Sequence, residues 1–198
     1  VSLRRADLVC VVGMNLELWM QSLLEAAKNG KVLSGTPGYF DASRFVERKE
    51  VPTGKVDFGL GDIHVQGNPH YQVDPENVRR IARGLCARLC ELDPVAAAGY
   101  RERLSAFEAR WVASMARWDA LMKPFAGAPV VTWHRSWTYF IERYGLNLVG
   151  TIEPKPGIPP GATHLKELID SMKRAGVKGI LIEPYYVVTV AEKVARAS

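Results

Sequence analysis

Three short apolar segments in the C-terminal part of the chain alternate with helical segments, and this alternation constrains the fold more than any other feature of the sequence. The apolar segments cover 129–133, 146–152 and 177–182, and helical patterns occupy 137–144 and 164–175. Strands that alternate with helices form parallel sheets, because each helix supplies the crossover between two neighbouring strands. The sequence therefore predicts an α/β fold for this region.

The N-terminal part begins with a related but less regular pattern. Leu8–Val12 is a continuous apolar run, which is typical of a strand buried on both faces of a parallel sheet. A helix is predicted over 16–28 and a short strand at Val32-Leu33, whereas 34–66 is irregular and rich in glycine, proline and charge. The predicted helix has one apolar face, made of Leu16, Trp19, Met20, Leu23 and Leu24.

A long helix is predicted in the middle of the chain, beginning at Asp93-Pro94 and ending near Lys123. At about 1.5 Å per residue it is about 45 Å long, which is more than one small lobe needs. We therefore expect an α/β protein with two lobes of parallel-type sheet flanked by helices and joined by this helix, with boundaries at 1–92, 93–124 and 125–198. An inward-facing stripe recurs every three or four residues and contains Tyr100, Leu104, Phe107, Trp111, Met115, Trp118 and Met122.

Composition excludes several classes of protein. The net charge of +5 is spread along the chain without a block of like charges, which argues against a nucleic-acid partner. No run of about 18 apolar residues is present, so no transmembrane segment is expected. The three cysteines, Cys10, Cys86 and Cys90, are too few for a disulfide framework, and we interpret the last two as small core residues rather than a disulfide or metal pair.

The segment Gly67–Pro75 places a histidine, His70, in a short stiff turn ahead of a helix. Pro69 fixes its own φ, while Asp74 and Pro75 are typical of the N-cap and first residue of a helix predicted over 75–90. His70 is thus a candidate ligand held by the backbone, although a surface turn histidine has the same pattern. His64 lies at the end of the irregular segment, where it either approaches His70 or is an exposed loop histidine.

Polar residues follow each of the three predicted C-terminal strands. His134, Glu153 and Glu183 stand directly after these strands. Ligands bind outside the carboxyl ends of strands in open parallel sheets, so the three residues are expected to converge on a site. The alternative for His134 is a core histidine buried under Trp133 and Trp137.

Several motifs resemble the metal-binding solute receptors of ABC importers, the cluster A-I type. They occur in the family's order over nearly the whole chain: Ala6–Val9 followed by Leu16–Trp19, Gly67–Tyr71 with Asp74-Pro75, Asp93-Pro94, Trp133–Phe140 with Tyr144–Leu146, and Pro160–Leu168. The resemblance implies a receptor of two lobes joined by a rigid helix, with one divalent metal ion held between them. It also implies a periplasmic or extracytoplasmic monomer that delivers its ion to an importer permease and has no enzymatic activity.

The resemblance assigns two of the four usual metal ligands to this chain, His70 and His134. By the family pattern the first ligand lies before Val1 and the fourth beyond Ser198, so we expect a chain truncated at both ends, with an incomplete site and with any lipid anchor in the missing N-terminal segment. Glu183, His64 and Glu153 are the candidate substitutes, and Asp74 or Glu183 is a candidate partner for the second imidazole nitrogen. Gln72 departs from the family pattern, which often has tryptophan there.

The ligand types favour zinc over manganese as the bound ion. Imidazole nitrogen suits Zn²⁺, whereas Mn²⁺ prefers carboxylate oxygen, and the family's manganese type carries a carboxylate at the position of His134. Two alternatives remain open from the sequence. One is a zinc-dependent hydrolase with His70, His134 and a glutamate as base, although no HExxH or GxSxG motif is present. The other is an adhesin-like surface protein, which solvent exposure of Trp111 and Trp118 would favour.

Overall fold

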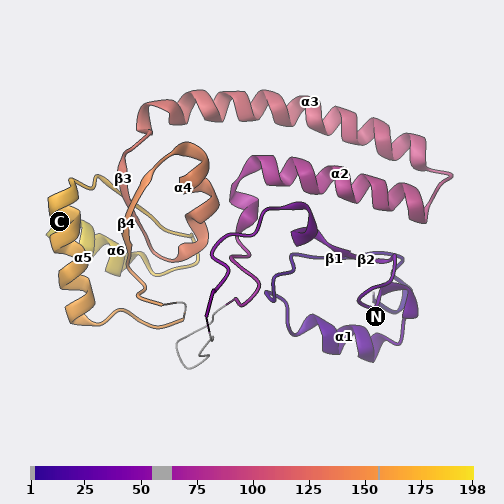
Figure 1. Cartoon of the computed structure of the whole chain (residues 1–198), viewed down its shortest axis with the longest axis horizontal. Coiled ribbons are helices and arrows are strands. Elements are labelled where there is room, and N and C mark those ends of the chain that lie inside the picture. The colour runs from indigo at the N-terminus through magenta and orange to yellow at the C-terminus, as the bar shows by residue number, and fades with distance from the viewer. Residues whose placement is uncertain (1–2, 55–63, 156) are drawn as a thin grey trace. The chain divides into compact units, whose positions relative to one another are not determined.

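The computed structural model describes residues 3–54, 64–155 and 157–198, and the chain divides into two compact units. Of the described residues, unit 1 contains 3–51 and 64–117, and unit 2 contains 52–54 and 118–198. Figure 1 shows the order of the elements along the chain. The predicted division at 92/93 and 124/125 stays a prediction of domain boundaries.

Unit 1 contains a two-stranded parallel sheet made of β1 (Val9–Val11) and β2 (Tyr39–Asp41). The predicted first strand is confirmed, but the predicted strand at Val32-Leu33 is wrong, because the short helix η2 (Gly30–Val32) lies there and buries Val32 under the sheet. The strand that pairs with β1 lies instead in the segment expected to be irregular. A 3-10 helix, η3 (Ala42–Phe45), follows it directly.

The first long helix, α1 (Met20–Ala27), begins four residues later than the sequence predicted. Gly13, Met14 and Asn15 all have positive φ, so the chain turns sharply after β1 before a helix begins. The predicted apolar face is also partly wrong: Leu24 is buried, but Leu16, Trp19 and Leu23 are exposed.

Two long helices that run in opposite directions complete unit 1. They are α2 (Pro75–Leu92), whose start at Pro75 and N-cap at Asp74 confirm the prediction, and α3 (Ala97–Met122), whose last residues from Trp118 belong to unit 2. At 26 residues, α3 is about 39 Å long. Its predicted stripe is the less exposed face: Met115 is buried, and Trp111 and Trp118 are half-buried. Cys86 is buried and Cys90 half-buried on α2, both as free thiols.

Unit 2 contains a three-stranded parallel sheet in the order β4-β3-β5, flanked by helices. The strands are β3 (Pro129–Thr132), β4 (Asn147–Thr151) and β5 (Gly179–Leu181), and the helices are α4 (Thr138–Tyr144), α5 (Ala162–Ala175) and α6 (Val188–Ala197). The predicted α/β alternation is confirmed. Gly145 and Gly176 end α4 and α5 in the left-handed conformation that favours glycine.

The core of unit 2 lies between its sheet and two of its helices. Its buried residues are Val131, Trp133, Ile152, Leu168, Met172, Ala191 and Val194. Since Val131 and Trp133 point into this core, the alternation along β3 directs Thr132 and His134 to the other face. None of the helices in the described ranges combines the length and apolar character needed to cross a membrane.

Candidate metal centre

His134 lies at the carboxyl end of the central strand of unit 2, between the positions that Glu153 and Glu183 occupy after the two outer strands. Thr132 on β3 is in register with Thr151 on β4 and with Leu181 on β5. Two residues further along each strand stand His134, Glu153 and Glu183, so sheet register explains why these three positions form one row. The sequence prediction that they gather at one edge is supported by this register.

The His134 imidazole is oriented by Glu153. Its Nδ1 lies 2.5 Å from Glu153 Oε2, and the two side chains are only 13% and 10% exposed. The other oxygen, Glu153 Oε1, accepts a hydrogen bond from the backbone N–H of Gly157 at 2.9 Å. A neutral ring that donates from Nδ1 carries its lone pair on Nε2, which is the arrangement in which histidine binds a metal ion.

The structure therefore places Glu153 against Nδ1 of His134, and the sequence analysis had not named Glu153 for this role. Both oxygens of Glu153 already accept hydrogen bonds, which fits a positioning carboxylate better than a ligand. Asp74 caps α2 by accepting from the backbone N–H of Glu76. In the sequence, the signal for this role of Glu153 is the turn that begins at Glu153-Pro154. This turn brings the backbone N–H of Gly157 back to the carboxylate.

Glu183 is buried at 7% exposure, and neither of its carboxylate oxygens has a hydrogen-bond partner within the described ranges. A buried carboxylate without a donor is unfavourable unless a cation compensates its charge. The neighbouring Tyr186 stacks on Trp133 with ring centroids 5.0 Å apart. Burial, with the nearby Glu153 and Glu183 charges as weaker causes, raises the pKa of Tyr186 to about 12.

In unit 1, the turn around His70 is fixed by hydrogen bonds on both sides. Asn68 is buried, accepts from the backbone N–H of His70 at 2.9 Å and donates to Glu50 at 2.9 Å. On the other side, the buried Tyr71 donates its hydroxyl to the carbonyl of Val12 at 2.6 Å, and Asn77 donates to the Tyr71 carbonyl at 3.0 Å. These contacts attach the turn to the end of β1 and to α2.

The end of β1 is itself fixed, so Tyr71 is anchored to a rigid point. The Glu17 carboxylate accepts from the backbone N–H groups of Val12 and Gly13 at 2.7 and 3.0 Å. The sequence analysis did not identify Tyr71 or Asn68 as positioning residues. The sequence did carry a signal for this role: Asn68 and Tyr71 directly flank Pro69-His70, and so short a segment can bury polar groups only against other parts of the fold.

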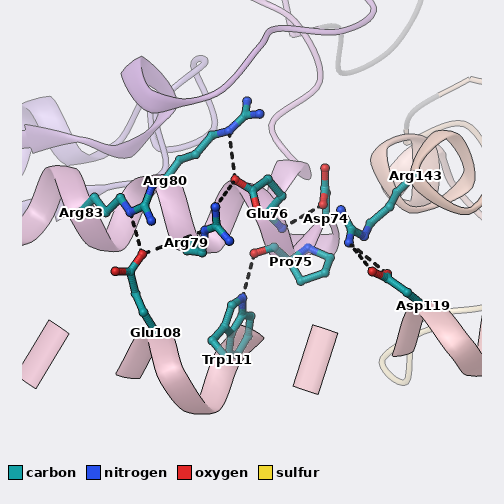
Figure 2. Close-up of polar contacts among 10 residues, drawn as sticks. All are labelled: Asp74, Pro75, Glu76, Arg79, Arg80, Arg83, Glu108, Trp111, Asp119 and Arg143. Carbon is teal, nitrogen blue, oxygen red and sulfur yellow. Dashed lines mark hydrogen bonds and ion pairs between the residues drawn. The ribbon is translucent and has the colours of Figure 1, made fainter. Parts of the chain in front are cut away.

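Contacts drawn in Figure 2 from Pro75 and Arg83 hold the first half of α2 against α3. Trp111 Nε1 donates to the carbonyl oxygen of Pro75 at 2.8 Å, and Arg83 pairs with Glu108 at 2.6 Å. Glu76 lies between two arginines of its own helix, Arg79 at 3.4 Å and Arg80 at 3.6 Å. Because Pro75 follows His70 by five residues, these contacts support the turn that carries the imidazole.

His64 approaches His70 within unit 1. The two ring centroids are 6.4 Å apart and the ring planes meet at 80°, so the edge of one ring faces the other. The remaining histidine, His164, lies in unit 2, where its Nε2 is 2.9 Å from the Thr151 carbonyl oxygen. The described residues contain no group of three or more histidine, cysteine, aspartate or glutamate side chains that could hold a metal ion.

Solved structures that resemble this chain indicate its structural class. The fold matches the zinc-bound crystal structure of a ZnuA mutant lacking residues 138–173, with a TM-score of 0.76, 25% identity, and coverage of 98% of this chain and 68% of that one. The parallel α/β units, the long helix and this likeness give the chain the fold of the ZnuA class of solute-binding protein. This confirms the resemblance found in the sequence.

The family follows from the sequence match. The family model described as "Zinc-uptake complex component A periplasmic" matches residues 1–198, and the chain belongs to this ZnuA family. Zinc uptake proteins named ZnuA are 29% identical over 117 residues in Brucella abortus and 24% identical over 208 residues in Yersinia pestis. The matches cover 59% and 99% of this chain, but only 35% and 65% of those relatives. The family comprises transport components rather than enzymes, which removes the hydrolase alternative.

Proposed function

We propose that this chain captures a divalent transition-metal ion, preferentially Zn²⁺, with His70 and His134 as ligands, and delivers it to the permease of an ABC importer. The protein acts outside the cytoplasm, as a monomer, in keeping with the periplasmic location in its family's description. The observation that carries the proposal is the 2.5 Å contact between His134 and Glu153, since it presets an imidazole for metal ligation.

Two features support zinc over manganese as the cargo. Both proposed ligands are imidazoles, which bind zinc well and manganese poorly. The zinc-uptake relative from Yersinia pestis also matches 99% of the chain at the sequence level. Zinc is therefore expected to outcompete manganese when both ions are present at equal concentration.

Glu183 is the further candidate ligand, and Glu153 acts on His134 instead of on the metal. The buried, uncompensated carboxylate of Glu183 is suited to a cation, and its strand end is in register with His134. A Glu183→Gln variant separates the two roles. It keeps the size of the side chain but removes the charge, so zinc affinity falls if Glu183 is a ligand and is unchanged if it is not.

The test of the function is a zinc titration of the intact chain and of His70→Ala and His134→Ala, using a competing chromophoric chelator. Each variant is expected to bind zinc at least about tenfold more weakly, equivalent to about 1.4 kcal/mol. His164→Gln is the matched control, because this histidine contacts a backbone carbonyl and is not a proposed ligand. Equal zinc affinity in all four proteins would remove the proposal.

A further inference from the structure

We propose that Cys86 and Cys90 form a two-sulfur site on α2 that binds one soft monovalent cation, of the Cu⁺ or Ag⁺ class. Both cysteines are free thiols and lie in unit 1. They stand about 17 and 22 Å along the helix from Pro75, so the pair is remote from the turn that carries His70. The inference goes beyond the proposed function and uses none of its ligands.

The two thiols share one face of α2, because Cys90 follows Cys86 by one helical turn. Side chains at this spacing are neighbours, with Cβ atoms about 5–6 Å apart. Two sulfurs that share an ion through bonds of about 2.3 Å are about 3.8–4.6 Å apart, a separation that rotation about χ1 brings within reach. A disulfide needs Cβ atoms about 3.5–4.5 Å apart, which is closer than a regular helix places them. The spacing therefore suits a shared ion better than a disulfide.

The two sulfurs differ in burial. Cys86 is only 8% exposed, whereas Cys90 is half-buried and its Sγ donates to the carbonyl oxygen of Ala97 at 3.6 Å. Burial raises the pKa of the Cys86 thiol, and Cys90 is close enough to raise this pKa further through a hydrogen bond and through its charge. The interpretation of both cysteines as small core residues explains Cys86 but not Cys90. Together they offer an ion one sulfur shielded from water and one that it can approach from solvent.

The chemistry of the pair selects the class of ion. Thiolate sulfur is a soft donor that favours Cu⁺, and within the described ranges no group of three or more histidine, cysteine, aspartate or glutamate side chains surrounds the pair, whereas Zn²⁺ prefers four ligands.

Binding breaks both S–H bonds, releases two protons to water and forms two sulfur–metal bonds without a change of oxidation state. The resulting complex carries one negative charge. Arg101 and Arg103 on α3 are near enough to lower the pKa of Cys86, so their charges also stabilise this complex.

The experiment is an oxygen-free Cu⁺ titration of the intact chain against a competing chromophoric chelator. The chain is expected to bind one equivalent of Cu⁺, and Cys86→Ser and Cys90→Ser are each expected to weaken binding at least about tenfold, because each removes one of two soft donors. Cys10→Ser is the matched control, since Cys10 is an exposed free cysteine on β1. Because two protons leave for each ion bound, affinity should rise by up to about 100-fold per pH unit near neutral pH.

X-ray absorption by Cu⁺ bound to the intact chain tests the site even if a serine variant fails to fold. Two sulfur neighbours and no nitrogen neighbour are expected. The double variant His70→Ala/His134→Ala should bind Cu⁺ as the intact chain does, so failure of this site and failure of the zinc proposal are separate results. Three results would overturn the site: unchanged Cu⁺ affinity in either serine variant, a nitrogen neighbour in the spectrum, or a Cys86–Cys90 disulfide in the chain isolated without reductant.

Discussion

The two units present their candidate histidines in different ways. In unit 2, His134 follows a strand, and a carboxylate with both oxygens engaged orients its ring. In unit 1, the hydrogen bonds around His70 act on the backbone, through Asn68 before it and Tyr71 after it. The comparison teaches that contacts to the ring and contacts to the backbone can each help to preset the same ligand type. It also predicts that loss of the contact that positions His134 lowers metal affinity first, whereas loss of a contact that positions the His70 turn lowers stability first.

Among the residues that position the two ligands, Glu153 is expected to have the largest effect on affinity when it is changed to alanine. Loss of the carboxylate frees the His134 ring to change its orientation and tautomer, and changes of this kind typically weaken metal binding about 10- to 100-fold. Chelator competition measures the affinity, and thermal unfolding in the absence of metal measures the fold. Unchanged zinc affinity would show that the ring needs no carboxylate, and the contrast between the units would be lost.

The corresponding change in unit 1 is Gly67→Ala. A Cβ at this position meets the Lys49 carbonyl oxygen at 2.9 Å, and the positive φ is unfavourable for alanine by about 1–3 kcal/mol. We expect a loss of this size in the free energy of unfolding, measured by denaturant titration, with a smaller fall in zinc affinity. Gly161→Ala, where an added Cβ meets nothing within 4 Å, is the matched control. Equal stability of the two variants would contradict the account of the turn.

A smaller effect is expected from Tyr71→Phe. The change removes the hydroxyl that binds the Val12 carbonyl, while the aromatic ring stays buried. One such hydrogen bond is worth about 0.5–1.5 kcal/mol, so denaturant unfolding should show a loss in this range. Zinc affinity should change less than in Glu153→Ala, because Asn68 and Asn77 still hold the turn. A loss of affinity that exceeds the loss of stability would overturn this ordering.

The last effect concerns alkaline pH and is confined to unit 2. Since the folded-state pKa of Tyr186 is about 12, above the ordinary value of 10.0, its contribution to stability is fully present below about pH 10 and is lost as pH rises toward 12. Tyr186→Phe should remove this part of the alkaline loss. Unfolding free energies at pH 9 and pH 11 for both proteins measure it, and an identical pH dependence would show that Tyr186 ionises normally.

Local signals predicted the parts of the fold that depend on neighbouring residues. Asp74 and Pro75 specify the start of α2, and Gly145 and Gly176 specify helix ends, because capping is decided within one turn. The predicted strand at Val32-Leu33 was wrong because two apolar residues carry no periodicity. The strand β2 was missed because its three residues are a strand only through pairing with β1.

The candidate site was predictable in position but not in its pairings. The places of His134, Glu153 and Glu183 after strands follow from the α/β pattern. Which carboxylate contacts His134 depends on the strand order β4-β3-β5 and on the turn that brings Gly157 back to Glu153. Likewise, the Tyr71 hydrogen bond joins residues 59 positions apart, and no local pattern specifies such a contact.

The central claim is that His70 and His134 bind one zinc ion, and the four histidines of the chain allow a direct test. The measurement is a zinc titration followed through the ring nitrogen and carbon-bound proton signals of each histidine in long-range ¹H–¹⁵N NMR spectra. The account predicts that the signals of His70 and His134 change together and stop changing at one equivalent of zinc, while His164 does not respond. The claim is contradicted if either ring is unaffected at saturating zinc, or if the two respond at separate equivalents.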